Sequence, residues 1–98
     1  MKKQIFNHFI KSITKLFNIT EDEMFAHSKK RSVVDARQLL YFLCALRDMR
    51  YSTTQEYLKE RGVDVSHTTI IHGVKQMQLR MNEDKDIASI ISTINRSI

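Results

Sequence analysis

The sequence contains no proline, only two glycines and a single cysteine among its 98 residues. Tight turns rely on glycine and proline, so a loop-rich β fold is disfavoured. The lone cysteine, Cys44, excludes an internal disulfide, and its apolar surroundings fit a small core residue in a reducing compartment. No run approaches the ~20 apolar residues of a membrane span, and polar residues interrupt the first segment where a signal peptide needs an apolar centre. We therefore expect a single-domain cytoplasmic protein.

The chemical groups of an enzyme are also missing. The sequence has no G-x-x-x-x-G-K-[ST] phosphate loop, which predicts a chain without an ATPase module. No nucleophile stands with a base in a recognisable pattern. His67 and His72 are spaced poorly for one helix face, and no further Cys or His pair completes a metal shell. We expect no catalytic residue, no cofactor and no metal.

The charged residues are unevenly distributed, and the excess of positive charge lies in the first half of the chain. The net charge of +5 comes entirely from residues 1–50, which carry 10 basic and 5 acidic side chains, while residues 51–98 carry 6 of each. This asymmetry favours an anionic partner for the first half, either nucleic acid or an acidic membrane surface. A purely solubilising charge is the alternative.

Apolar residues recur with helical spacing along the chain, and no segment alternates as a strand does. The pattern predicts an all-α fold, a compact bundle of about six helices. The expected helices cover residues 5–17, 21–27, 33–49, 53–61, 67–81 and 87–98. Residues 33–49 are apolar nearly all round, which predicts a central helix. We divide the single domain, 1–98, into an N-terminal amphipathic helix (1–19), a core (20–81) and a C-terminal helix (82–98).

Helix ends are predicted from capping residues. Thr20 with Glu23 and Ser52 with Gln55 are spaced as capping boxes. The remaining signals are Ser32 with Asp35 as a helix start, Ser66 as an N-cap and Gly62 as a left-handed C-cap residue.

The first and last helices each carry one apolar stripe. The last stripe consists of Ile87, Ile90, Ile91, Ile94 and Ile98. In so small a domain both stripes are needed for the core, so we expect these two helices to pack against each other. A basic amphipathic first helix lying on an anionic membrane is the less favoured alternative.

The helices expected over 53–61 and 67–81 are joined by a glycine-containing turn, and the second begins with small hydrogen-bonding side chains. This layout is typical of a helix-turn-helix, whose second helix enters the major groove of DNA by its N-terminal turns. Spacing alone is a weak signal, because any helical hairpin has a turn.

Two separated motifs make the signal specific. A basic segment, Ser28 to Arg31, precedes the Ala-Arg-Gln of residues 36–38, and His-Thr-Thr-Ile-Ile-His follows at residues 67–72. With FNITEDEMFAHSKKRSVVDARQLLYFL and SHTTIIHGVKQM around them, residues 16–81 resemble the DNA-binding domain IV of the bacterial replication initiator DnaA, which has a Trp repressor-like fold. The resemblance implies double-stranded DNA as the partner, with replication proteins as a further class.

The resemblance also assigns roles to individual residues. It implies that Arg37 enters the minor groove, that His67 and Thr68 contact bases and that Thr69 contacts the DNA backbone. The basic residues of the loop lie along phosphates in the family, and here they are Lys29, Lys30 and Arg31. Charge and position alone add Arg50 and Lys75 as phosphate candidates. Ser66 is a candidate because it stands where the family has a base-contacting residue, and His72 faces either DNA or water.

Two departures from the family pattern lie before His67. Val65 stands where the family has Arg, and Ser66 where it has an Asp that both caps the helix and contacts a base. The stretch from Ser52 to His67 is also about two residues longer. Serine offers a base edge a different acceptor pattern, so the preferred DNA sequence is left open.

The predicted function is therefore sequence-specific DNA binding at DnaA-box-like sites, in control of replication initiation or transcription, by a nucleoid-associated protein. A protein-interaction or structural module that reuses the fold is the alternative.

Overall fold

The computed structural model describes residues 1–97, and in this part of the chain all regular structure is helical. The described residues form six helices: α1 (Lys2–Phe17), α2 (Glu21–Met24), α3 (Arg31–Leu46), α4 (Tyr51–Glu60), α5 (His67–Glu83) and α6 (Lys85–Arg96). The predicted all-α fold is confirmed.

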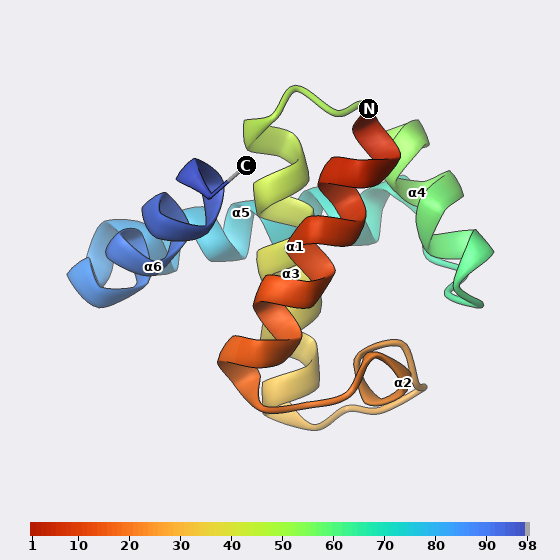
Figure 1. Ribbon diagram of the computed structural model, residues 1–98, viewed down its shortest axis with the longest axis horizontal. Helices are drawn as coiled ribbons and strands as arrows, with labels where there is room; N and C mark the ends of the chain where they lie inside the picture. The colour runs from red at the N-terminus through yellow and green to blue at the C-terminus, as the bar shows by residue number, and fades with distance from the viewer. Residues whose placement is uncertain (98) are drawn as a thin grey trace.

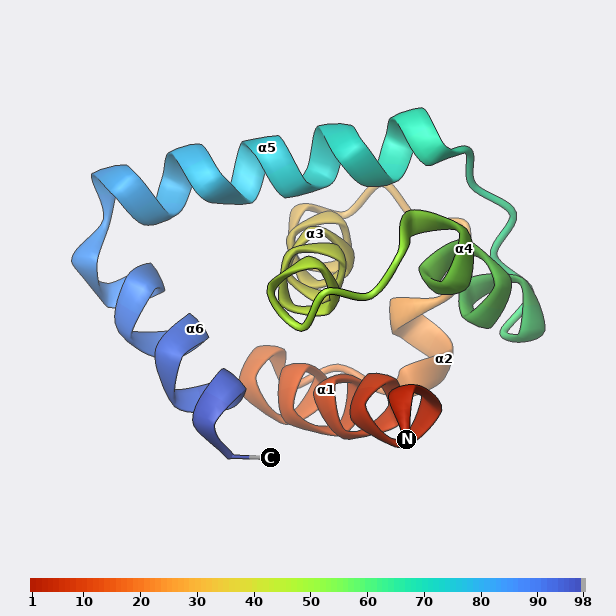
Figure 2. The same ribbon diagram turned by 90° about the horizontal axis from the view of Figure 1, so that it is seen from above.

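Helix α3 lies at the centre of the molecule, with α1 on one side and α5 on the other (Figures 1 and 2). Helices α4 and α6 close the two ends of this arrangement, and α2 lies below α4 in Figure 1. The central position follows from the composition of α3, which is apolar on nearly every face. Its buried residues are Val33, Ala36, Leu39, Leu40, Tyr41, Phe42, Leu43 and Cys44.

Helix α1 covers α3 with a continuous apolar stripe. Phe6, Phe9, Ile10 and Ile13 are completely or almost completely buried. Each such side chain contributes about 1.5–3 kcal/mol when it is removed from water. The α1 face of α3 is therefore a large source of stability.

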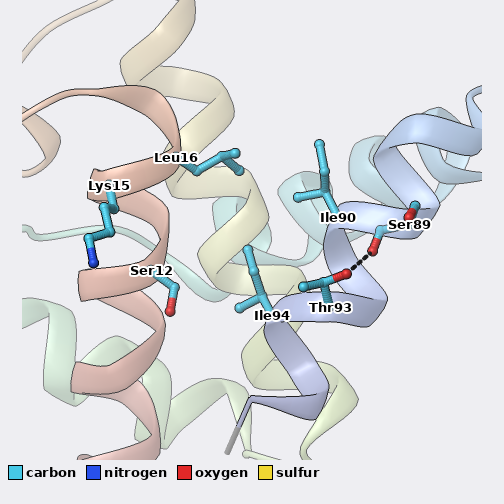
Figure 3. Close-up of a pocket in the computed structure, with 7 residues that line it drawn as sticks. All are labelled: Ser12, Lys15, Leu16, Ser89, Ile90, Thr93 and Ile94. Carbon is cyan, nitrogen blue, oxygen red and sulfur yellow. Dashed lines mark hydrogen bonds between the residues drawn. The ribbon is translucent and has the colours of Figure 1, made fainter.

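The expected close packing of the first helix on the last is not found within residues 1–97. Helix α1 packs chiefly against α3, whereas α6 packs against α5 and α3 through Ile91 and Ile94. A hydrogen bond of 2.8 Å between His8 Nε2 and Ser97 Oγ joins α1 to the end of α6. Between α1 and α6 lies an open groove of about 420 Å³, with side chains from both helices on its walls (Figure 3). Leu16 on its α1 wall remains 47% exposed. An apolar stripe shows which face of a helix is buried, but it does not show which helix packs against that face. Ile98, the last residue of the predicted stripe, lies outside the described residues.

Two of the predicted helix starts are confirmed. Thr20 and Glu23 form a complete capping box at the start of α2, and the resulting hydrogen bonds hold the pKa of Glu23 below its usual value. Ser66 caps α5, its Oγ accepting from the Thr69 amide at 3.2 Å. Helix α2 nevertheless ends at Met24 rather than at residue 27.

The two other predicted starts are wrong. Helix α3 begins at Arg31 and α4 at Tyr51, and neither has a side-chain cap, so Ser32 and Ser52 lie inside the first turns. The predicted partners of these serines, Asp35 and Gln55, form other contacts. Gln55 Nε2 donates to the carbonyl of Val65 at 2.7 Å, and this bond ties α4 to the turn before α5.

The ends of α3 and α4 depend on left-handed backbone conformations. Asp48 has a φ of 57°, which ends α3 at Leu46 instead of near residue 49. Gly62 has a φ of +81°, as predicted for a C-cap glycine. The amides of Gly62 and Val63 donate to the carbonyls of Lys59 and Leu58, which is the Schellman pattern, and the chain then turns toward α5.

Candidate nucleic-acid interface

Helices α4 and α5 and the turn between them form the predicted helix-turn-helix. The turn spans residues 61–66, and the Gln55 bond to Val65 fixes its last part. Helix α5 then runs along the outer side of α3 (Figure 2). Its N-terminal end is therefore set by contacts on two sides, from α4 and from α3.

The first turn of α5 presents polar side chains to solvent. His67, Thr68 and Thr69 are all exposed. The hydroxyl groups of Ser66 and Thr69 lie 3.1 Å apart and hydrogen bond to each other. The first amides of a helix have no intrahelical acceptor, so they and these side chains together suit base edges and phosphate oxygens.

Close packing at Gly73 determines how near α5 lies to α3. Gly73 is buried, and a Cβ atom built on it would lie 2.7 Å from Cδ2 of Tyr41 and 3.3 Å from Cγ of Gln38. Only a residue without a side chain allows this approach. No role was predicted for Gly73, although a glycine inside a helix costs about 1 kcal/mol and so indicates a close contact.

The loop before α3 carries the basic segment. Lys29, Lys30 and Arg31 are exposed, as expected for phosphate contacts. Ser28 Oγ accepts from the amide of Lys30 at 3.1 Å, which gives the loop a local turn. Lys29 and Lys30 therefore lie on a loop that is held by hydrogen bonds, and Arg31 is the first residue of α3.

Arg37 binds this loop. Its Nη2 donates to the carbonyl of Ser28 at 2.8 Å and to that of Ala26 at 3.2 Å. Its Nε is buried and makes no hydrogen bond within the described residues. In the structure Arg37 is an anchor of the loop through its Nη2 group, and its predicted minor-groove contact stays a prediction.

Between the loop and α5 lies a polar hollow of about 360 Å³, which we call the cationic cleft. It brings together three of the predicted site residues: Lys29, Arg31 and His72. Its other walls are formed by Val34, Asp35, Gln38, Gln76 and Arg80. Thr69, Arg37 and His72 line a smaller adjoining hollow of about 150 Å³.

Some of the predicted site residues lie outside the cationic cleft, and some residues that line the cleft were not predicted. Lys30, Lys75 and the residues 66–68 do not line it. Gln76 and Arg80 follow His72 at intervals of four, which places all three on one face of α5. That spacing was readable in the sequence, whereas their position opposite the loop depends on the tertiary structure.

Two ionisable groups of α3 have pKa values raised by burial. Cys44 is completely buried, and burial raises the pKa of its thiol to about 12 despite a hydrogen bond with Thr54. Burial also raises the pKa of Tyr41, against the opposing charge of Arg37. Residues 1–97 contain no cluster of three His, Cys, Asp or Glu side chains that would hold a metal ion. No helix among them is long and apolar enough to cross a bilayer.

A short turn between two helices, an exposed polar start to the second and an adjacent basic loop define a helix-turn-helix domain of the DNA-binding type. Comparison with known families makes the class specific. The model described as "Bacterial dnaA protein helix-turn-helix" matches residues 7–77, and the chain belongs to this family. The match confirms the resemblance and includes most of α1.

Relatives with the name chromosomal replication initiator protein DnaA align over nearly the whole chain. The protein of Ehrlichia ruminantium is 29% identical over 91 residues, covering 90% of this chain and 18% of the relative. That of Geobacter sulfurreducens is 26% identical over 88 residues, covering 90% and 19%. That of a Jannaschia species is 27% identical over 97 residues, covering 99% and 20%. The chain thus spans about a fifth of the length of these relatives.

Proposed function

We propose that this domain binds double-stranded DNA sequence-specifically, at sites similar to the DnaA box, and acts in the control of replication initiation or of transcription. The observation that carries the proposal is the exposed, capped start of α5 directly beside the cationic cleft. One surface thereby offers base-reading and phosphate-binding groups together. Protein–DNA interfaces divide their contacts in this way.

His67 and Thr68 are the groups proposed to reach base edges. The major groove admits an α-helix, and its base pairs present distinct donor and acceptor patterns there. Ser66 stands in the turn as a cap, so its hydroxyl is already used by the Thr69 amide. Directly before His67 a hydroxyl group therefore stands where the family has a carboxylate, and the base preference is expected to differ from the family pattern.

Lys29, Lys30 and Arg31 are the groups proposed to lie along phosphates. Together with Lys75 and the amides at the start of α5, they can neutralise or bind roughly four to six phosphates. The logarithm of the association constant then falls against the logarithm of salt concentration with a slope of about −4 to −5. Lys29, Lys30 and Arg31 are three of the ten basic residues in the first half of the chain.

Fluorescence anisotropy with three duplexes tests the proposal. A DnaA-box duplex, a scrambled duplex and a random-sequence pool are compared over a range of salt concentrations. We expect one sequence class to bind most tightly, with the steep slope given above. A slope near zero for every duplex would remove the DNA-binding function.

A second candidate is a protein-binding role, which the groove between α1 and α6 favours. Its walls combine small hydroxyl residues with Leu16, Ile90 and Ile94 (Figure 3). A replication protein is the partner class that the family suggests. Equal, weak binding to all three duplexes would favour this candidate over sequence-specific recognition.

A further inference from the structure

Asp35 lies within the cationic cleft and contacts two arginines at once. Its Oδ1 is 3.3 Å from Nε of Arg31 and 3.0 Å from Nη1 of Arg80. The Asp35 side chain is only 15% exposed, compared with 84% for Arg31 and 34% for Arg80. One carboxylate oxygen thus joins the start of α3 to the second half of α5.

The charge around Asp35 is otherwise positive. Among the described residues that line the cleft, Asp35 is the one acid, beside Lys29, Arg31 and Arg80. A carboxylate in this place occupies the position that a phosphate oxygen would take, because both accept hydrogen bonds from guanidinium groups in the same manner. The cleft therefore contains its own anionic group.

The two contacts differ in how easily they are exchanged. The pair with Arg31 is an i, i+4 pair on an exposed side chain, and such pairs are weak in water. Arg80 is more enclosed, and its bond to Asp35 connects two helices. A phosphate can displace the carboxylate from Arg31 readily and from Arg80 with more difficulty.

We propose that Asp35 is an internal counter-ion that lowers the number of phosphates the domain neutralises, and so limits sequence-independent DNA binding. The inference rests on the proposed DNA-binding function. While Asp35 is ionised, Arg80 is held on the carboxylate, whereas the exposed Arg31 exchanges the carboxylate for a phosphate. Removal of the Asp35 charge releases Arg80 for a further phosphate contact.

The experiment compares Asp35→Asn with Asp48→Asn on a random-sequence duplex, by anisotropy at several salt concentrations. Asp48 is exposed at the opposite end of α3, and asparagine tolerates its left-handed conformation, so the control makes the same change in net charge away from the cleft. We expect Asp35→Asn to bind more tightly than both wild type and control. Its slope should be steeper by about 0.9, which corresponds to one additional phosphate, bound by Arg80.

Arginine variants identify the groups that are released. Arg80→Gln should remove about 0.9 from the slope in the Asp35→Asn background and change it little in the wild-type background, whereas Arg31→Gln should remove about 0.9 in both. Thermal unfolding without DNA checks that every variant is folded. If Asp35→Asn is unstable, Arg80→Gln in the wild-type background still tests the proposal, since a full loss of about 0.9 would mean that Arg80 already binds phosphate.

Two results would overturn the inference while leaving DNA binding intact. Weaker binding by Asp35→Asn would show that the carboxylate positions the arginines for DNA instead of withholding them. Equal slopes for Asp35→Asn and Asp48→Asn would show that it does neither. If wild type itself gives no salt-dependent binding, the proposed function fails, and this outcome is distinct from both.

Discussion

The two sides of α3 are packed in different ways. On one side α1 buries Phe6, Phe9, Ile10 and Ile13, all large and apolar. On the other side α5 buries Ile70, Gly73 and Met77, and the glycine makes the closest contact. The polar groups of the candidate site gather beside α5 and not along the α1 stripe.

This difference suggests that one side of α3 provides most of the stability of the domain and the other positions its DNA-binding groups. Large side chains on the α1 side remove much apolar surface from water, and exchange among apolar residues of similar volume is tolerated there. The α5 side has little room, because a single methyl group at residue 73 would overlap Tyr41. The first side is expected to determine whether the domain folds, and the second where its DNA-binding groups lie.

The largest effect is expected from Phe9→Ala on the α1 side. It should lower the free energy of unfolding by about 3–5 kcal/mol, the cost of a large cavity in a core. Urea denaturation measures this loss, and Leu16→Ala on the same helix is the control, because Leu16 is largely exposed. DNA affinity, measured where the variant remains folded, should not change. A clear loss of DNA affinity in the folded variant would contradict the different roles of the two sides of α3.

Gly73→Ala is expected to affect both properties. Overpacking against Tyr41 should cost about 1–3 kcal/mol of stability, reduced by the better helix propensity of alanine. Because α5 must move away from α3, DNA affinity should fall as well. Gln78→Ala, exposed on the same helix, provides the comparison. Unchanged stability and binding would show that the close approach is unnecessary.

His67→Ala should weaken specific DNA binding by about 1–3 kcal/mol, or roughly 5- to 150-fold, without altering stability. Its matched control is His8→Ala on α1, which removes a histidine from the opposite side of α3. Anisotropy with the preferred and the scrambled duplex measures the change. Equal losses for both duplexes would remove His67 from base recognition.

Arg37→Ala should have the smallest effect, about 1 kcal/mol in binding, because the loop loses its anchor while its cations remain. A double-mutant cycle with Lys29→Ala separates anchoring from direct contact. Anchoring predicts that the effect of Arg37→Ala becomes smaller once Lys29 is absent. Additive losses would instead support the predicted minor-groove contact.

The sequence predicted the helices well because their periods are local. Their ends were harder to predict, since Ser32 and Ser52 have cap-forming side chains but lie within the first turns of α3 and α4. The partner of each stripe was missed for another reason. An amphipathic pattern is a property of one helix, whereas the packing of α1 on α3 depends on every helix.

The sequence motifs of the candidate site could be predicted, but the contacts between its residues could not. The basic segment and the 67–72 motif are contiguous, so both could be read directly. The bond between Asp35 and Arg80 joins residues 45 positions apart, and the Arg37 contacts depend on how the loop folds back. Gly73 was missed as well, although the position of a glycine inside a helix can indicate a close neighbour.

The most direct measurement is a titration of the isotope-labelled protein with its preferred duplex, followed by amide chemical-shift changes in NMR spectra. The division between the two sides of α3 predicts the largest changes in residues 28–38 and 66–80, with small changes along α1 and α6. Maximal changes at the groove between α1 and α6, with residues 66–80 unaffected, would contradict it.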